Sequence, residues 1–137
     1  MNKPINFTAS KSSGASLCVL SVGQCSYDQP RITALINNHL NVPVDEVSSS
    51  RDAFQALENK SYALVLINRV LDSTGESGHE LIENIKRKNG SVKVMLVSNF
   101  PEAHTQAVSL GALPGFGKDR LQDPSTVACI KAALGLQ

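Results

Sequence analysis

The feature that most constrains the fold is an apolar run from Tyr62 to Ile67 that ends abruptly in the side-chain amide of Asn68. A short run without polar alternation, bounded by turn-forming residues, predicts a strand buried on both faces, as in the middle of a parallel sheet. In open α/β sheets, binding and catalytic groups lie just beyond the C-terminal ends of such strands. Asn68 takes that position, so its chemistry bears directly on function.

Strand and helix patterns alternate along the rest of the chain. Further strands are predicted at residues 16–22, 44–48, 92–97 and 112–116. Apolar residues at helical spacing predict helices at about residues 30–40, 51–59, 78–88, 101–110 and 124–134. Asp28 and Ser50 are the expected N-caps of the first two helices. This order predicts an α/β fold, (βα)5, with a doubly wound parallel five-stranded sheet and helices on both faces.

Composition indicates one domain and an ordinary surface. The chain has 137 residues, and we expect a flexible leader over residues 1–15 and a single domain over residues 16–137. The net charge of +1 gives no electrostatic reason to expect nucleic acid or an anionic membrane as a partner. Three cysteines without Cys-x-x-Cys spacing, and the lack of an apolar run of membrane-spanning length, predict a cytoplasmic protein.

Several short motifs, taken in order, resemble the receiver domain of bacterial two-component response regulators. They are the strand ending at Asn68, the helix start Gly78-His79-Glu80-Leu81-Ile82, the strand end Val94-Met95-Leu96-Val97-Ser98, and Leu110-Gly111-Ala112 followed by Lys118. The resemblance covers about residues 16–134 and implies the flavodoxin-like receiver fold. In that family, an aspartate ending the third strand accepts a phosphoryl group from a histidine kinase, and two acids after the first strand hold Mg²⁺.

The resemblance also implies which residues stand at the family's reactive positions. Asn68 falls at the phosphoacceptor, Gly23 and Gln24 fall at the acidic pair, and Ser98 and Lys118 match the hydroxyl and the lysine that contact phosphoryl oxygens. Mg²⁺ prefers anionic oxygen ligands, and none of the first three residues supplies a carboxylate. The chain therefore resembles a degenerate receiver, or pseudo-receiver, in which we expect no metal, no cofactor and no catalytic residue.

Two further departures concern the switch that couples the family's reactive site to its surface. The loop after Asn68 is longer than is usual in the family and lacks its proline. The family's aromatic residue before the lysine falls at Gly115, with Phe116 displaced by one position. Both departures favour a module that does not respond to phosphorylation.

The resulting hypothesis is a phosphorylation-independent, receiver-like signalling module of a two-component type system that acts by protein–protein interaction and is not an enzyme. In the family, the face formed by the fourth helix, fifth strand and fifth helix carries dimerisation or partner docking. The resemblance therefore implies a protein partner or a homodimer contact drawn from about Pro101 to Leu134.

A cysteine phosphatase is the alternative. Cys25 and Arg31 form a Cys-x5-Arg sequence directly after the first predicted strand, where low-molecular-weight tyrosine phosphatases place their phosphate-binding loop. Asp123-Pro124 resembles the general-acid dipeptide of that family. Against this interpretation, Asp28 would put a negative charge inside a dianion cradle, and Pro30 lacks one of the N–H donors that the cradle needs.

The remaining candidate residues suggest no site. His39, His79 and His104 lie on different predicted helices at no ligand spacing, so no metal site is expected. Cys18 is expected to be an inert core residue. A flavodoxin-like cofactor binder is a third interpretation, but the loop after the first strand lacks the hydroxyl- and glycine-rich phosphate cradle.

Overall fold

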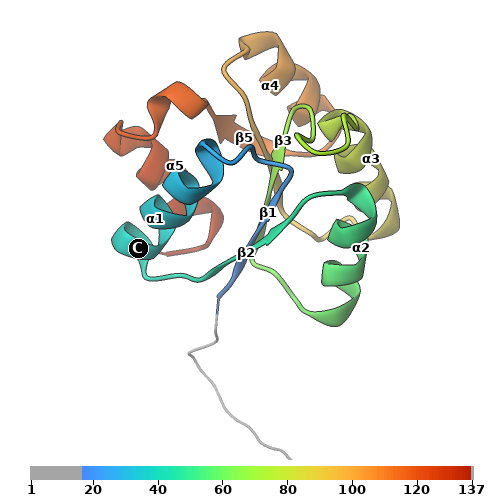
Figure 1. The fold of residues 1–137 in the computed structure, drawn as a ribbon, viewed down its shortest axis with the longest axis horizontal. Helices are drawn as coiled ribbons and strands as arrows, with labels where there is room; N and C mark the ends of the chain where they lie inside the picture. The colour runs from blue at the N-terminus through green and yellow to red at the C-terminus, as the bar shows by residue number, and fades with distance from the viewer. Residues whose placement is uncertain (1–16, 137) are drawn as a thin grey trace, which may run out of the picture.

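The computed structural model describes residues 17–136, in which five parallel strands form one sheet. The strand order is β2-β1-β3-β4-β5, and all four pairings are parallel (Figure 1). The strands are β1 (Val19–Val22), β2 (Val44–Val47), β3 (Leu64–Asn68), β4 (Val94–Val97) and β5 (Leu113–Phe116). The predicted doubly wound parallel sheet is confirmed.

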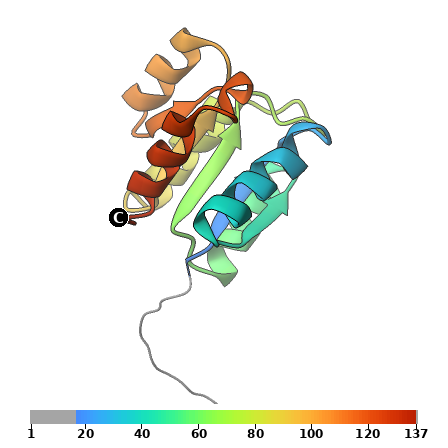
Figure 2. The ribbon, with the colours of Figure 1, turned by 90° about the vertical axis from the view of Figure 1, so that its left-hand side faces the viewer.

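Helices cover both faces of the sheet (Figure 2). They are α1 (Asp28–Leu40), α2 (Ser50–Asn59), α3 (Gly78–Lys88), α4 (Pro101–Ser109) and α5 (Pro124–Ala133), with a short 3-10 helix, η1 (Lys118–Arg120), after β5. Helices α1 and α5 pack on one face, and α2, α3 and α4 pack on the other. No helix in the described part of the chain has the length and apolar character needed to cross a membrane.

Strand β3 lies at the centre of the sheet, and all five of its residues are buried. Its side chains alternate between the two cores: Val65 and Ile67 face α2, α3 and α4, whereas Leu64 and Leu66 face α1 and α5. Burial of each of these side chains contributes about 2 kcal/mol of transfer free energy. Because a slip by one residue would exchange the two faces, this packing fixes the register and holds Asn68 at the C-terminal edge.

The start of α1 differs from the prediction. Asp28 is the first helical residue, and the preceding Tyr27 has helical dihedral angles and no side-chain cap. The Asp28 carboxylate turns instead toward Cys25 and Lys118. The N-cap assignment of Asp28 is therefore wrong, because its side chain is used in contacts at the edge of the sheet.

The start of α2 is also shifted by one residue. Ser49 is the N-cap, and its hydroxyl accepts a hydrogen bond from the backbone N–H of Asp52 at 3.0 Å. Ser50, the predicted cap, is the first residue of the helix, and its own N–H donates to the Glu76 carboxylate. Adjacent serines make the two caps equivalent in sequence, and the extended backbone of Ser49 decides between them.

The least regular predicted strand is confirmed as β5, at the edge of the sheet. An edge position accommodates Pro114, which has no N–H to donate. Gly115 is needed because an added Cβ would lie 2.0 Å from the carbonyl oxygen of Leu96.

The first strand is shorter than predicted. It begins at Val19 rather than residue 16, with Cys18 buried just before it. The predicted leader, residues 1–15, lies outside the described residues.

Candidate functional site

Asn68, Ser98 and Lys118 line one pocket of about 360 Å³ at the C-terminal edge of the sheet. The pairing of β3 with β4 places Asn68 beside Val97, so Ser98 follows directly on the neighbouring strand. Lys118 begins η1, just after β5. The other lining residues are Cys25, Arg69, Val70, Asp72, Asn99 and Phe100. The structure therefore brings together three residues that are far apart in the sequence.

The Asn68 side chain is buried, with 5% of the residue exposed. Its Nδ2 donates a hydrogen bond of 2.9 Å to the backbone carbonyl oxygen of Gly23. This bond joins the ends of β3 and β1. An ionised aspartate at this position would have no hydrogen to donate and would face the carbonyl oxygen with a negative charge. The amide thus fits its surroundings in a way that a phosphoacceptor carboxylate does not.

Gly23 contributes only backbone to the site. It has a φ of 74°, and an added Cβ would lie 2.5 Å from Cδ2 of Leu71. Its carbonyl oxygen also accepts a hydrogen bond from the N–H of Asp72 at 2.9 Å. The long loop after Asn68 therefore folds back over the end of β1 and fills the space that a side chain at Gly23 would need.

Gln24 does not line the pocket. Its Nε2 lies 3.5 Å from the carbonyl oxygen of Val22, so the side chain turns back toward the strand. Its Oε1 is buried and has no hydrogen-bond partner among residues 17–136. Of the two residues at the family's acidic positions, one supplies a carbonyl oxygen to Asn68 and the other points away.

Asp28 contacts Lys118 and Cys25 of the site, although its position in the sequence predicts a helix cap. Its carboxylate is largely buried, and Oδ2 lies 3.6 Å from Nζ of Lys118 and 3.2 Å from Sγ of Cys25. Its other oxygen lies 3.9 Å from the guanidinium of Arg31. A sequence signal was present, because Asp28 precedes the buried residues Ile32 and Ile36 by four and eight positions, which places it on the core-facing stripe of α1.

Ser98 is 3% exposed, and its hydroxyl oxygen accepts a hydrogen bond from the N–H of Phe100 at 3.1 Å. The Ser98 carbonyl oxygen lies 2.7 Å from Nε2 of His104, and this ring nitrogen must be the donor because a carbonyl only accepts. The His104 ring also lies over Gly115, where an added Cβ would be 3.1 Å from its Cε1. A histidine from α4 therefore takes the space that a side chain at Gly115 would need, while Phe116 is buried in the core.

The lining of the pocket does not fit Mg²⁺, the metal that the receiver fold implies. Asp72 is its single carboxylate-bearing lining residue and is exposed, and Asp28 is already shared between Lys118 and Arg31. Within the described residues, no three His, Cys, Asp or Glu side chains gather in a group that could hold a metal ion. A hard divalent cation needs more anionic oxygen atoms than this pocket offers.

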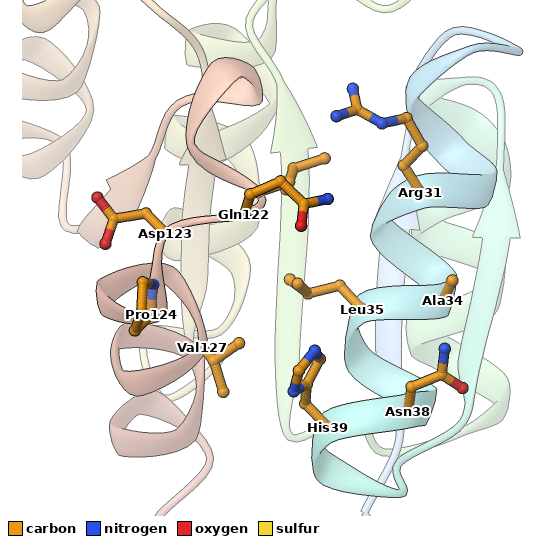
Figure 3. Close-up of a pocket in the computed structure, with 10 residues that line it drawn as sticks. Arg31, Ala34, Leu35, Asn38, His39, Gln122, Asp123, Pro124 and Val127 are labelled. Atoms are coloured by element: carbon orange, nitrogen blue, oxygen red, sulfur yellow. The ribbon is translucent and has the colours of Figure 1, made fainter.

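The residues of the phosphatase alternative do not form one site. Arg31 and Asp123 lie on opposite sides of a groove of about 530 Å³ between α1 and α5, and Cys25 is not among the residues that line it (Figure 3). Cys25 instead contacts the Asp28 carboxylate, which opposes an approaching phosphate. Asp123 caps α5, and the hydrogen bond from the backbone N–H of Ser125 lowers the pKa of its carboxyl, opposite to what a general acid needs.

The three histidines belong to separate local contacts. His39 lines the groove between α1 and α5. His79 contacts the carbonyl oxygen of Ala103 at 2.8 Å, and so links α3 to α4, while His104 contacts Ser98. The structure thus gives each histidine a role in packing or in a groove wall.

Comparisons with known proteins report a similarity of fold. No family model and no curated protein sequence matches the chain. A putative response regulator from Chloroflexus aurantiacus is similar over 88% of this chain and 99% of its own, with 14% identity and a TM-score of 0.77. The signal receiver domain of an HD domain-containing protein from Pseudomonas fluorescens is similar over 94% of this chain and 93% of its own, with 17% identity and a TM-score of 0.76.

NtrX from Brucella abortus is similar over 88% of this chain, with 17% identity and a TM-score of 0.72, and this chain spans only 27% of that protein. The receiver domain of TorR, the response regulator of a TMAO respiratory system, is also similar, with 17% identity and a TM-score of 0.70. At these identities the likeness establishes a shared fold. The chain therefore has the fold of response-regulator receiver domains.

Proposed function

We propose that this chain is a receiver-like signalling module of a two-component type system that works by protein–protein contact and without phosphorylation. Its fold is that of domains found in response regulators. The finer part of the proposal, independence from phosphorylation, rests on the residues at the C-terminal edge of the sheet.

The observation that carries the proposal is the hydrogen bond from Asn68 to the carbonyl oxygen of Gly23. Asn68 places a neutral amide where a receiver has the reacting carboxylate, and that amide is already hydrogen-bonded. Its acceptor is the backbone of Gly23, the residue at the position of a metal ligand in receivers. Without the metal and the nucleophile, in-line phosphoryl transfer lacks its main electrostatic stabilisation.

The face formed by α4, β5 and α5 is the proposed contact for a partner or a second copy of the chain. Val108, on α4, is a large apolar side chain exposed to solvent on this face. His104 connects the face to the pocket, because its ring lies over β5 and donates to the Ser98 carbonyl. A partner that moves α4 would thus also act on the loop that follows β4.

The test is an amide chemical-shift titration with Mg²⁺ and beryllofluoride, which mimics a phosphoryl group. We expect no saturable shift at Asn68, Ser98 or Lys118, whereas a phosphorylatable receiver domain in the same buffer serves as the positive control. Saturable shifts clustered at these three residues would overturn the proposal.

The matched variant is Asn68→Asp, which restores a carboxylate at the phosphoacceptor position without the acidic pair. We expect this variant to show no saturable amide shifts with the same reagents. It should also lose about 1–3 kcal/mol of unfolding free energy, because a buried hydrogen bond is replaced by an unfavourable contact with the Gly23 carbonyl. Urea unfolding measures the loss. A variant as stable as the wild type would contradict the role given to the amide.

A further inference from the structure

We propose that the pocket lined by Asn68, Ser98 and Lys118 is a docking site for a carboxylate side chain of a protein partner. This inference rests on the proposed function, since it names the chemistry that a partner would present to the unused phosphoacceptor pocket. The α4-β5-α5 face is a separate contact and is not part of it.

The pocket offers hydrogen-bond donors that the protein does not use. Lys118 makes an ion pair of 3.6 Å with Asp28 and donates no hydrogen bond to any described residue. The Ser98 hydroxyl accepts from Phe100 and has no acceptor of its own within residues 17–136. Asn68 uses one Nδ2 hydrogen on Gly23 and keeps the second. An ionised carboxylate, which only accepts hydrogen bonds, complements such a set.

The charges around the pocket also favour an anion. Arg69 and Lys118 are the cations among the lining residues, and the exposed Asp72 is the anion, so the lining carries a net charge of +1 (two cations minus one anion). Asp28 offsets Lys118 from behind, but Arg31 shares that carboxylate. Arg69 has no carboxylate within ion-pair distance in the described part of the chain, and its guanidinium lies 4.8 Å from the centroid of the Phe100 ring.

The depth and rim of the pocket favour a side chain over a free ion. Asn68 and Ser98 are buried polar groups, and hydrogen bonds from such groups to an ion are strengthened where water is excluded. The rim carries Phe100 and Val70, whose exposed fractions are 50% and 42%. Apolar residues that flank the carboxylate in a partner would cover these two side chains, which a free inorganic anion would leave in water.

The experiment uses three pools of capped peptides that differ only in the central residue, which is Asp, Asn or phosphoserine. The flanking positions hold Leu, Val and Phe in all combinations. Binding to the full chain is followed by fluorescence anisotropy and amide chemical shifts. We expect the Asp pool to bind about tenfold more tightly than the Asn pool, as one or two charge-assisted hydrogen bonds imply. Its shifts should cluster at Asn68, Ser98, Phe100 and Lys118.

Two charge-removing variants and a control locate the binding. Lys118→Gln and Arg69→Gln should each weaken binding of the Asp pool to near the level of the Asn pool. Lys131→Gln removes a lysine of α5 that does not line the pocket, and binding should be unchanged. Because Arg69 is exposed and makes no ion pair with the described residues, its variant folds even if the Lys118 variant does not.

Several outcomes would overturn the proposal. Equal affinity for the Asp and Asn pools would show that the carboxylate charge is not recognised. Unchanged binding in both variants would place the binding site outside this pocket. Tighter binding of the phosphoserine pool would assign the pocket to a phosphate instead of a carboxylate. Equal shifts with acetate alone at the same concentration would indicate an adventitious ion only. None of these results depends on beryllofluoride, so failure here is distinct from failure of the proposed function.

Discussion

The two ends of the parallel sheet differ in the contacts that cationic and hydroxyl groups make with a carboxylate. At the N-terminal end, the hydroxyl of Tyr62 donates to Asp45 at 2.6 Å, and the amine of Lys60 donates to the same oxygen at 3.0 Å. At the C-terminal end, the Asp28 carboxylate lies 3.6 Å from Lys118 and 3.9 Å from Arg31, both beyond hydrogen-bond length. Asp28 accepts a hydrogen bond from the Cys25 thiol at 3.2 Å, but neither of its cationic neighbours donates one to it.

This difference separates a structural ion cluster from a candidate binding site. The hydrogen bonds from Tyr62 and then Lys60 lower the pKa of the Asp45 carboxyl, so that carboxyl is ionised and committed to its neighbours. Lys118 is held by charge alone and can turn toward another anion without breaking a hydrogen bond to the described residues. The long ion pair of Lys118 is therefore compatible with ligand binding, whereas the short hydrogen bonds to Asp45 are structural contacts.

The largest expected effect tests how tightly the backbone is packed at each end. Gly78→Ala would place a Cβ 2.1 Å from the carbonyl oxygen of Asn68, whereas Gly90→Ala at the opposite end meets nothing closer than 3.7 Å. We expect Gly78→Ala to cost at least about 3 kcal/mol of unfolding free energy and Gly90→Ala to change it by less than about 1 kcal/mol. Urea unfolding compares the two, and equal costs would break the contrast in packing.

An intermediate effect is expected from Tyr62→Phe, which removes the shortest bond of the Asp45 cluster. The loss should be about 1 kcal/mol near neutral pH. Because the folded pKa of Asp45 is lowered, its contribution is present above the ordinary Asp range and is lost as pH falls through the folded pKa. The variant should therefore raise the Asp45 pKa, measured by carbonyl NMR titration, and an unchanged pKa would argue against the cluster.

The same cluster predicts a second pH dependence. Burial, followed by the hydrogen bond to Asp45, raises the pKa of Tyr62 to about 12. A raised pKa means that the phenol contributes stability below its ordinary pKa, and that this contribution is lost as pH rises toward 12. Tyrosinate absorbance of the wild type minus that of Tyr62→Phe isolates this titration.

The smallest expected effect is that of Lys118→Gln. The ion pair with Asp28 is long, and Arg31 remains beside that carboxylate, so the unfolding free energy should change by less than about 1 kcal/mol. Urea unfolding at low and high salt measures it. A larger loss would show that Lys118 is structural, and the two ends of the sheet would then be more alike than their distances indicate.

Much of the fold could be predicted because its signals are local. The apolar run of β3 and the spacing of apolar residues in the helices gave the order and type of each of the five strands and five helices. The differences concern the caps, the start of the first strand and the short η1. Ser49 and Ser50 cannot be told apart by composition, and only the backbone conformation selects one.

The candidate site was less predictable because its contacts join distant segments. The resemblance suggested Asn68, Ser98 and Lys118 as candidate residues, but it gave no reason to place Asp28 beside Lys118. The position of the His104 ring over Gly115 was also missed, since it depends on how close α4 lies to β5. Candidate residues could thus be chosen by their order along the chain. The side chains of Asp28 and His104 that pack against them come from α1 and α4 and could not.

The packing at Gly23 limits which side chains this position can accept. An acidic residue at position 23 would have to clear Leu71, which is fully buried, and shrinking that leucine to alanine costs about 2–5 kcal/mol. The left-handed backbone of Gly23 adds strain to any replacement. A carboxylate at this position therefore needs a compensating change in the loop after Asn68, and each single substitution on the way to such a pair of changes gives a destabilised protein.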